Sequence, residues 1–297
     1  MNKLKTRIFI LCAGKLTKYY GISRQLLDVN GEGILGRMIR LIREECNDEI
    51  IIITNNNIIE TYVKGLGYNN IMILHPTDEL NIMVSLYASR EEWVDKNIFI
   101  YGDIIFSRKA IKKIINSDNK LSFFIRIKPH LYLNKRYNEQ FAMLIPKNEI
   151  ERISNIIVNS YEGSKKVDQG GEYILKKIYS EFGITLYNEY LGFKSHKTRN
   201  LISKLCLNDI MRNVFYSMIR PFEGMLIRFI FYRAKLTTRW RNKLIKLFLG
   251  KEVPDYNKNI SLSTEYVVEI HDITDDIDSP REYKDYIKKI VKKGLLK

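Results

Sequence analysis

The sequence predicts an α/β fold with a mostly parallel central sheet, and three observations support this prediction. Short apolar runs rich in Ile, Phe and Val alternate with longer stretches of helical periodicity through the first half of the chain. Runs such as EIIIIT and NIFIY are continuously apolar, which is typical of strands buried on both faces of a sheet. Helices between successive strands imply parallel pairing with crossover connections, and therefore three α/β/α layers.

The expected elements follow one another in a regular order. Candidate strands, each short and apolar, are residues 8–11, 49–54, 71–74, 97–101, 121–126 and 141–145. Candidate helices between and after them are residues 34–46, 57–65, 82–93, 107–116 and 148–158. A last apolar run, residues 266–270, precedes an acidic loop and a final helix. Ligands of such sheets bind at the carboxyl ends of strands, so the residues that follow each strand are the candidates for function.

Composition excludes several classes of protein. The chain has 297 residues, 45% of them hydrophobic, which is enough for a large folded core. Its three cysteines, Cys12, Cys46 and Cys206, are too scattered for a disulfide framework or a CxxC metal site, and fit a reducing compartment. No apolar run approaches the roughly 20 residues of a membrane span, and the N-terminal one is too short for a signal peptide. We expect a cytoplasmic protein, either soluble or peripheral at the inner face of the membrane.

The net charge of +15 is concentrated in one segment. Residues 194–251 contain fourteen Lys or Arg and only two acids, Asp209 and Glu223, so the rest of the chain is close to neutral. This composition predicts an α/β domain over residues 1–194, a basic helical insertion over 195–260, and a C-terminal strand and helix over 261–297 that complete the domain.

The insertion has an amphipathic core at residues 211–249, where an apolar stripe with Trp240 runs beside a basic one. Such a helix can dock on an anionic membrane surface, or it can pack on the catalytic domain with its basic side in solvent. No helix-turn-helix, zinc-finger or RNA-binding motif accompanies the charge, so nucleic acid is not the expected partner. Self-association into a homo-oligomer stays open.

The loop after the first strand reads LCAGKLTK at residues 11–18. It lacks both GxxxxGK[ST] and GxGxxG, so it is neither a Walker loop nor a dinucleotide fingerprint. Gly14 would still let backbone N–H groups approach a phosphate, whose charge Lys15, Lys18 and Arg24 would balance. The alternative is an ordinary loop glycine with solvated lysines.

Two acidic positions follow later strands. Asp103 ends the run YGD at a strand terminus, where a carboxylate can bind Mg²⁺ or form a Gly-Asp turn. The loop before the last helix contains Asp272, Asp275, Asp276 and Asp278, followed by Ser-Pro-Arg-Glu at 279–282, which predicts an N-cap, a proline at the first helical position and a capping-box glutamate. Capping does not require four aspartates, and a cation would relieve their repulsion.

The order of these three signals resembles the nucleotidyltransferase family that makes nucleotide-activated sugars and alcohols. That family opens with Leu-Ala-Ala-Gly-x-Gly-x-Arg, then Pro-Lys-x-Leu and a Val-x-Gly turn; here the frame reads LCAGKLTK, SRQLL at 23–27 and VNGEGILGRMI at 29–39. The resemblance continues in SLYASREEW, IFIYGDIIFS and DITDDIDSPREYKDY, and covers about residues 7–180 and 262–292. The second glycine of the family is Leu16 here, its arginine falls on Lys18, and its Pro-Lys pair falls on Ser23 and Arg24.

The resemblance implies a Rossmann-like, GT-A-like nucleotidyltransferase fold and a Mg²⁺-dependent reaction. An NTP and a phosphorylated sugar or small alcohol would give an NDP-sugar or CDP-alcohol plus pyrophosphate, for surface polysaccharide or lipid-linked glycan synthesis. Lys18 and Arg24 would stabilise the developing charge. Asp103 and Asp278 would hold the metal, with Asp276 as the reserve ligand. The remaining expected nucleotide contacts are Leu11, Cys12, Ala13, Gly14, Lys15 and Gly102 at the strand ends, with Asn81 and Ser85 at the base or ribose.

Two other classes of function stay open. A GT-A-type glycosyltransferase would share the architecture, but it usually has Asp-x-Asp after a strand, whereas Asp103 is followed by Ile104 and Ile105. A basic protein that binds nucleic acid or a membrane surface, with a non-catalytic nucleotidyltransferase-like domain, is the second alternative. Pyrophosphate release would distinguish the first hypothesis from both.

Overall fold

The computed structural model describes residues 4–13, 18–19, 21–76, 82–127, 130, 132–133, 139–164, 170–184 and 265–296. Residues 1–125, 140–184 and 265–297 form one compact unit, and residues 126–139 and 185–264 belong to a second. The insertion predicted at 195–260, with its amphipathic segment 211–249, lies outside the described residues, as do the predicted domain boundaries. The candidate site lies wholly in the first unit.

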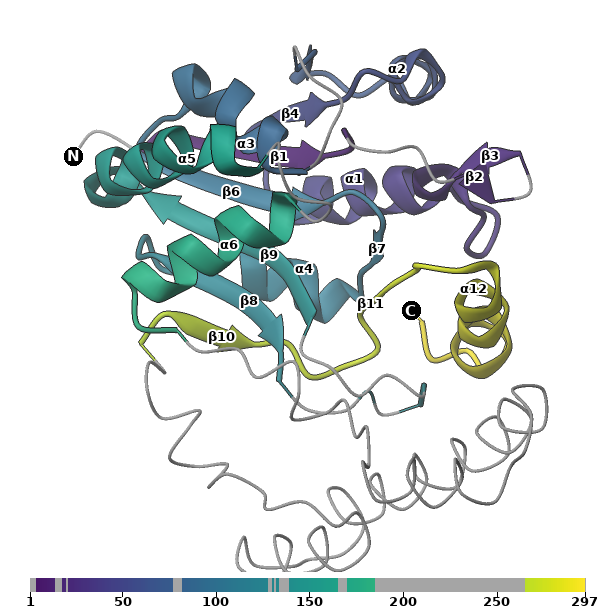
Figure 1. Ribbon diagram of the computed structural model, residues 1–297. Helices are drawn as coiled ribbons and strands as arrows, with labels where there is room; N and C mark the ends of the chain where they lie inside the picture. Colours follow the sequence, from purple (N-terminus) through teal and green to yellow (C-terminus); the bar gives the residue numbers. More distant parts are fainter. Residues whose placement is uncertain are drawn as a thin grey trace, which may run out of the picture. The chain divides into compact units, whose positions relative to one another are not determined.

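A seven-stranded sheet forms the centre of this unit, with strand order β10-β8-β9-β6-β1-β4-β5 (Figure 1). Its strands are β1 (Thr6–Leu11), β4 (Glu49–Ile53), β5 (Ile71–Leu74), β6 (Lys96–Tyr101), β8 (Ser122–Arg126), β9 (Glu139–Pro146) and β10 (Val267–Glu269). β1 pairs parallel with β4 and β6, β4 with β5, and β10 with β8. β9 runs antiparallel to β6. The sheet is mostly parallel, as the apolar runs predicted.

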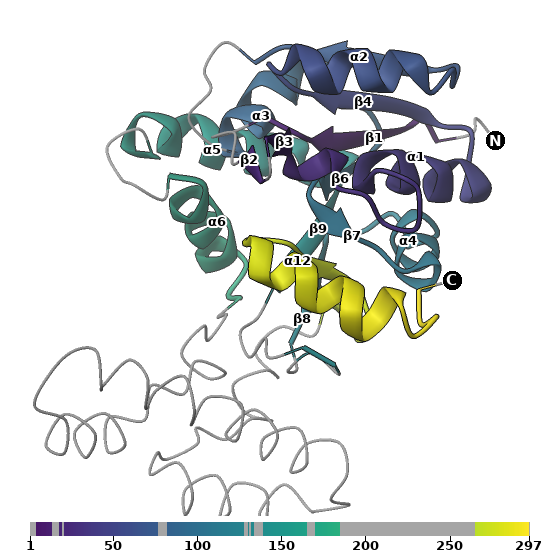
Figure 2. The same cartoon turned by 90° about the vertical axis from the view of Figure 1, so that its right-hand side faces the viewer.

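Helices cover both faces of the sheet (Figures 1 and 2). One layer contains α1 (Ile34–Glu45), α2 (Asn57–Gly65) and α4 (Arg108–Ile115); the other contains α3 (Ile82–Ser89), α5 (Ile150–Ser164) and α6 (Gly170–Glu181). Side chains of β1 alternate between the two: Ile8 and Ile10 join the core with the first layer, while Phe9 stacks on Phe99 on the other side. The inner strands β1, β4 and β6 are therefore buried on both faces, and the three-layer prediction is confirmed.

Several short elements complete the unit. A hairpin of β2 (Lys18–Tyr19) and β3 (Ile22–Ser23) leads into a 3-10 turn, η1 (Arg24–Leu26). Further 3-10 turns are η2 (Arg90–Glu92), which continues α3, and η3 (Lys147–Glu149), which precedes α5. β7 (Ile104–Ile105) follows β6 and pairs antiparallel with β11 (Asp275–Asp276), so the C-terminal segment lies beside the end of β6.

The final helix, α12 (Pro280–Tyr286), continues into a π-helical turn, η6 (Ile287–Val291). Two of its predicted features are confirmed: Ser279 is the N-cap and accepts from Glu282 N, and Pro280 occupies the first helical position. The Glu282 carboxylate accepts from the backbone N–H of Asp278, one residue before the N-cap. Tyr286 is fully buried, and its hydroxyl donates to the Ile273 carbonyl at 2.9 Å. Residues 265–296 are thus packed into the same unit as the opening strands (Figure 2).

Candidate functional site

The ends of β1 and β6 meet at the carboxyl edge of the sheet, where Leu11 lies opposite Tyr101. The next residue, Gly102, donates from its backbone N–H to the Leu11 carbonyl at 3.0 Å. A Cβ at Gly102 would collide with the Cys12 sulfur and lie 2.9 Å from the Leu11 carbonyl oxygen. Glycine is therefore required here by the close approach of the two strands, and Asp103 is the next residue in the chain.

Arg24 joins the two predicted metal carboxylates. Its Nη2 lies 2.9 Å from Oδ2 of Asp103, and its Nη1 lies 3.1 Å from Oδ1 of Asp278. Nη1 also donates to the Ile277 carbonyl at 3.3 Å. Because the two nitrogens belong to one planar guanidinium, the carboxylates from mid-chain and from the C-terminal segment lie close together. The sequence interpretation depended on this proximity.

A buried hydrogen bond fixes the backbone just before Arg24. The Asn56 amide donates to the hydroxyl of the preceding residue, Ser23, at 2.8 Å, and both side chains are buried. The Asn56 carbonyl oxygen caps α2 by accepting from Ile58 N at 3.0 Å. One side chain thus fixes the start of α2 and the backbone that carries Arg24.

A second contact ties the opening loop to the C-terminal segment. The hydroxyl of Tyr283, on α12, donates to the Asp28 carbonyl at 2.7 Å. Together with the Arg24 pairs, this bond connects residues that are more than 250 positions apart in the sequence. The site is therefore assembled by the fold and not by one continuous motif.

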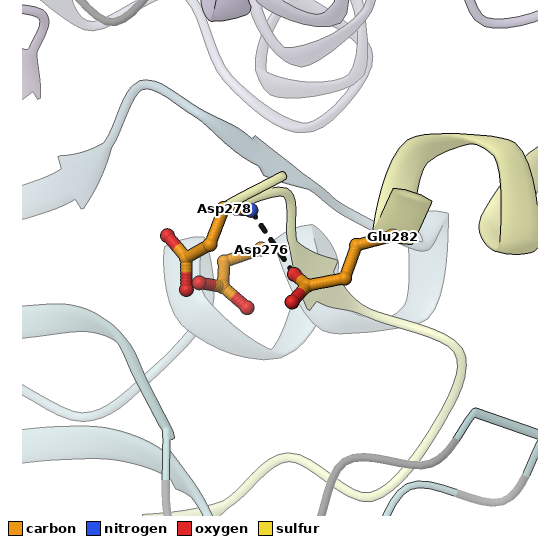
Figure 3. A group of neighbouring side chains, drawn as sticks. All are labelled: Asp276, Asp278 and Glu282. Atoms are coloured by element: carbon orange, nitrogen blue, oxygen red, sulfur yellow. Dashed lines mark hydrogen bonds between the residues drawn. The ribbon is translucent and has the colours of Figure 1, made fainter. Parts of the chain in front are cut away.

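Three carboxylates gather at the end of β11: Asp276, Asp278 and Glu282 (Figure 3). One oxygen from each lies within 4.8 Å of the others. Asp276 is 6% exposed, and the Glu282 carboxylate accepts from the backbone N–H of Asp278 at 3.1 Å. All the donors are oxygens, which is the set that Mg²⁺ and Ca²⁺ prefer, so the residues present fit a hard divalent cation.

The other two aspartates of the acidic run, Asp272 and Asp275, stabilise the fold or lie buried within it. Asp272 accepts from the Ser107 hydroxyl at 2.5 Å and from Thr274 N at 2.7 Å, and so attaches the segment to the start of α4. Asp275 is fully buried in β11, opposite Ile105. Hydrogen bonding at Asp272 therefore reduces like-charge repulsion in this loop, and of the four aspartates Asp276 and Asp278 belong to the carboxylate cluster.

The surroundings of the strand ends also change the pKa of one thiol, that of Cys12. Burial raises the pKa of the Cys12 thiol, and the negative charge of Asp103 raises it further. A thiol with a raised pKa stays protonated and unreactive at neutral pH. Cys12 is therefore a buried thiol that packs next to Gly102.

The remaining predicted contacts are only partly described. Leu11 and Cys12 are each 3% exposed, and Ala13 is half-buried. Gly14, Lys15 and Asn81 lie outside the described residues, and of Lys18 only the backbone, in β2, is described. Ser85 is fully buried on α3, and its hydroxyl has no hydrogen-bond partner in the part of the chain that the structure describes.

Sequence reasoning missed two residues near these strand ends. Glu282 was predicted only as a capping residue, although it lies four positions after Asp278, at a spacing that brings side chains together where a helix begins. Gln140, at the start of β9, donates to the Tyr101 hydroxyl at 2.9 Å next to Gly102. No signal in the sequence marks Gln140, because its position depends on the antiparallel register of β9 against β6.

Among the helices that the structure describes, none combines the length and the apolar composition needed to cross a membrane.

No family model matches the chain. Two curated proteins with the name bifunctional IPC transferase and DIPP synthase are similar to it. The protein of Archaeoglobus fulgidus is 25% identical over 114 residues, which are 38% of this chain and 23% of that protein. The protein of Thermococcus kodakarensis is 28% identical over 112 residues, which are 37% of this chain and 26% of that protein. The match thus spans about a quarter of the length of these relatives.

Among solved structures, CTP:phosphocholine cytidylyltransferase from Streptococcus pneumoniae is similar with a TM-score of 0.44 and 16% sequence identity. The similarity covers 60% of this chain and 87% of the cytidylyltransferase.

Proposed function

We propose that the protein is a nucleotidyltransferase that condenses an NTP with a phosphorylated sugar or small alcohol and releases pyrophosphate. The observation that carries the proposal is the meeting of Asp103 and Asp278 at Arg24, at the carboxyl edge of β6 and beside the end of β1. The name of the two curated relatives includes the word transferase, which agrees with a group-transfer reaction.

The reaction needs little covalent chemistry from the protein. An oxygen of the acceptor phosphate attacks the α-phosphorus of the NTP, a new P–O bond forms, and the bond to the β-phosphate oxygen breaks so that pyrophosphate leaves with the electron pair. Positioning and charge neutralisation therefore provide most of the catalysis. Arg24 and Lys18 would stabilise the charge of the phosphates, and the backbone of residues 11–15 would approach them closely.

In this proposal a divalent metal, Mg²⁺, binds the carboxylates of Asp103 and Asp278, which both contact Arg24. Asp276 and Glu282 lie near enough to Asp278 to share the site. When bound there, the ion would neutralise phosphate charge and help to orient the α-phosphate. The role of this chain is to hold the two carboxylates together, through β11 pairing with β7 and through the packing of α12.

The glycosyltransferase alternative gains no support from the strand end. Ile104 and Ile105, which stand where an Asp-x-Asp motif would continue, are 2% and 1% exposed and form β7. They hold β11 by strand pairing and offer no ligand atoms from their side chains.

Release of pyrophosphate is the test. Wild-type protein with Mg²⁺ is screened against the four NTPs, each with a panel of sugar phosphates and phosphoalcohols. Asp103→Asn and Asp278→Asn should lower the rate by at least about a hundredfold while the urea unfolding curve stays unchanged. Asp118→Asn, which changes an exposed carboxylate after α4, is the charge-matched control and should keep full activity. Full turnover by Asp103→Asn would refute the assignment.

The proposal also places the enzyme in the cytoplasm, where it would activate building blocks for surface polysaccharide or lipid-linked glycan, with residues 211–249 at an anionic membrane surface. Sedimentation with vesicles of phosphatidylglycerol, compared with phosphatidylcholine, tests the surface contact. Equal recovery in the supernatant with both lipids would contradict it.

A further inference from the structure

We propose that Arg24 is a latch on the metal carboxylates: it competes with the divalent cation for Asp103 and Asp278, and it is released when the phosphates of an NTP offer it another anion. This inference rests on the proposed function and adds an order of binding to it. The nucleotide would prepare the metal site, and the metal would bind tightly only together with the nucleotide.

The competition follows from the contacts of the guanidinium. Arg24 uses Nη2 for Oδ2 of Asp103 at 2.9 Å and Nη1 for Oδ1 of Asp278 at 3.1 Å. A cation held by both carboxylates needs oxygens from the same two groups. A second positive charge beside the guanidinium would also be repelled by it. Each cation therefore weakens the binding of the other.

Release is possible because the side chain can move while its backbone stays in place. The Ser23 hydroxyl is held by Asn56, which fixes the backbone just before Arg24, and the Arg24 side chain is 20% exposed. A guanidinium binds phosphate through two parallel N–H donors as well as it binds carboxylate. An NTP bound at the strand ends can therefore take Arg24 away from the two aspartates without any change in the fold.

The proposed role of Arg24 depends on its being an arginine. Lysine carries one nitrogen and acts as a point charge, whereas the planar fork of arginine can contact two carboxylates at once. Arginine stands at this position where the family has lysine, and of the two residues arginine is better suited to contact both carboxylates at once.

Binding of Mn²⁺ to the protein alone, measured by calorimetry, tests the competition. Arg24→Gln should bind Mn²⁺ about tenfold more tightly than wild type, as expected when the two ion pairs no longer compete. Arg24→Lys should fall between them. Unchanged or weaker Mn²⁺ binding by Arg24→Gln would overturn the latch.

The control is Arg40→Gln, because Arg40 also joins two carboxylates, Glu32 at 2.9 Å and Glu44 at 2.7 Å. It removes the same charge from α1 and should leave Mn²⁺ binding at the wild-type level. A gain equal to that of Arg24→Gln would mean that net charge alone determines affinity, and would overturn the proposal.

Two further variants separate the latch from the proposed function. Asp103→Asn and Asp278→Asn should each weaken Mn²⁺ binding. If both bind as wild type does, the metal site of the proposed function is wrong; if both lose binding while Arg24→Gln gains none, only the latch is wrong. Inorganic tripolyphosphate in EDTA tests the release step: Arg24→Gln should bind it several-fold more weakly than wild type, and equal binding would contradict release.

Discussion

Replacement of Gly102 by alanine should destabilise the protein where β6 meets β1. The new Cβ would lie 2.9 Å from the Leu11 carbonyl oxygen and 3.5 Å from its carbon, and would collide with the Cys12 sulfur. Leu11 is paired with Ile53 on one side and Tyr101 on the other, so its carbonyl cannot move away without disturbing both ladders. Overpacking of this kind costs about 1–3 kcal/mol of unfolding free energy.

Urea unfolding followed by far-UV circular dichroism measures this loss. Gly65→Ala is the matched control, because a Cβ there meets nothing within 4 Å and the residue ends α2. It should leave the unfolding free energy unchanged or raise it by up to about 1 kcal/mol. Combining Gly102→Ala with Cys12→Ala should recover part of the loss, since the sulfur is removed and the carbonyl is not. If Gly102→Ala unfolds at the wild-type urea midpoint, the reasoning that β1 and β6 approach too closely for a side chain at this position is refuted.

Three further predictions concern residues around the site. Asn56→Ala should lower the unfolding free energy by about 1–2 kcal/mol, because α2 loses its cap and the Ser23 hydroxyl its partner; Asn56→Asp, which keeps the cap, should lose less in the same urea assay. The raised pKa of Cys12 means that the unfolded chain releases this proton first, so the contribution of Cys12 to stability should be constant below about pH 9.0 and be lost as pH rises above it. Cys12→Ala should flatten that fall in melting curves taken from pH 8 to 10.5, and an identical slope would contradict the assignment. Tyr286→Phe should lower the unfolding free energy by about 0.5–1.5 kcal/mol, because the hydrogen bond to the Ile273 carbonyl is lost. An unchanged unfolding free energy would contradict that hydrogen bond.

The strands could be predicted because burial on both faces leaves a strong mark in the sequence. EIIIIT and NIFIY have no polar alternation, and both lie in the centre of the sheet. The helix at Asn57–Gly65 has the predicted bounds, since its N-cap Asn56 and terminal glycine are local signals. By contrast, α5 extends to Ser164, beyond the predicted end at 158, because no residue before it stops the helix.

Other parts of the site depend on contacts that no local pattern contains. β7 and β11 have two residues each, too few for any periodicity, yet their pairing brings Asp276 to the end of β6. The proximity of Asp103 and Asp278 could be predicted from the rule that strand ends gather, but the arginine between them could not. The contact between Arg24 and Asp278 depends on the positions of two side chains that are 254 residues apart in the sequence.

Phosphorus-31 NMR of the complete reaction tests the proposed chemistry most directly. With Mg²⁺, an NTP and its acceptor phosphate, the account predicts that pyrophosphate and a new diphosphate diester appear in equal amounts, and that neither forms with Asp103→Asn. Orthophosphate as the sole product, or consumption of a nucleotide-sugar without pyrophosphate, would contradict nucleotidyl transfer.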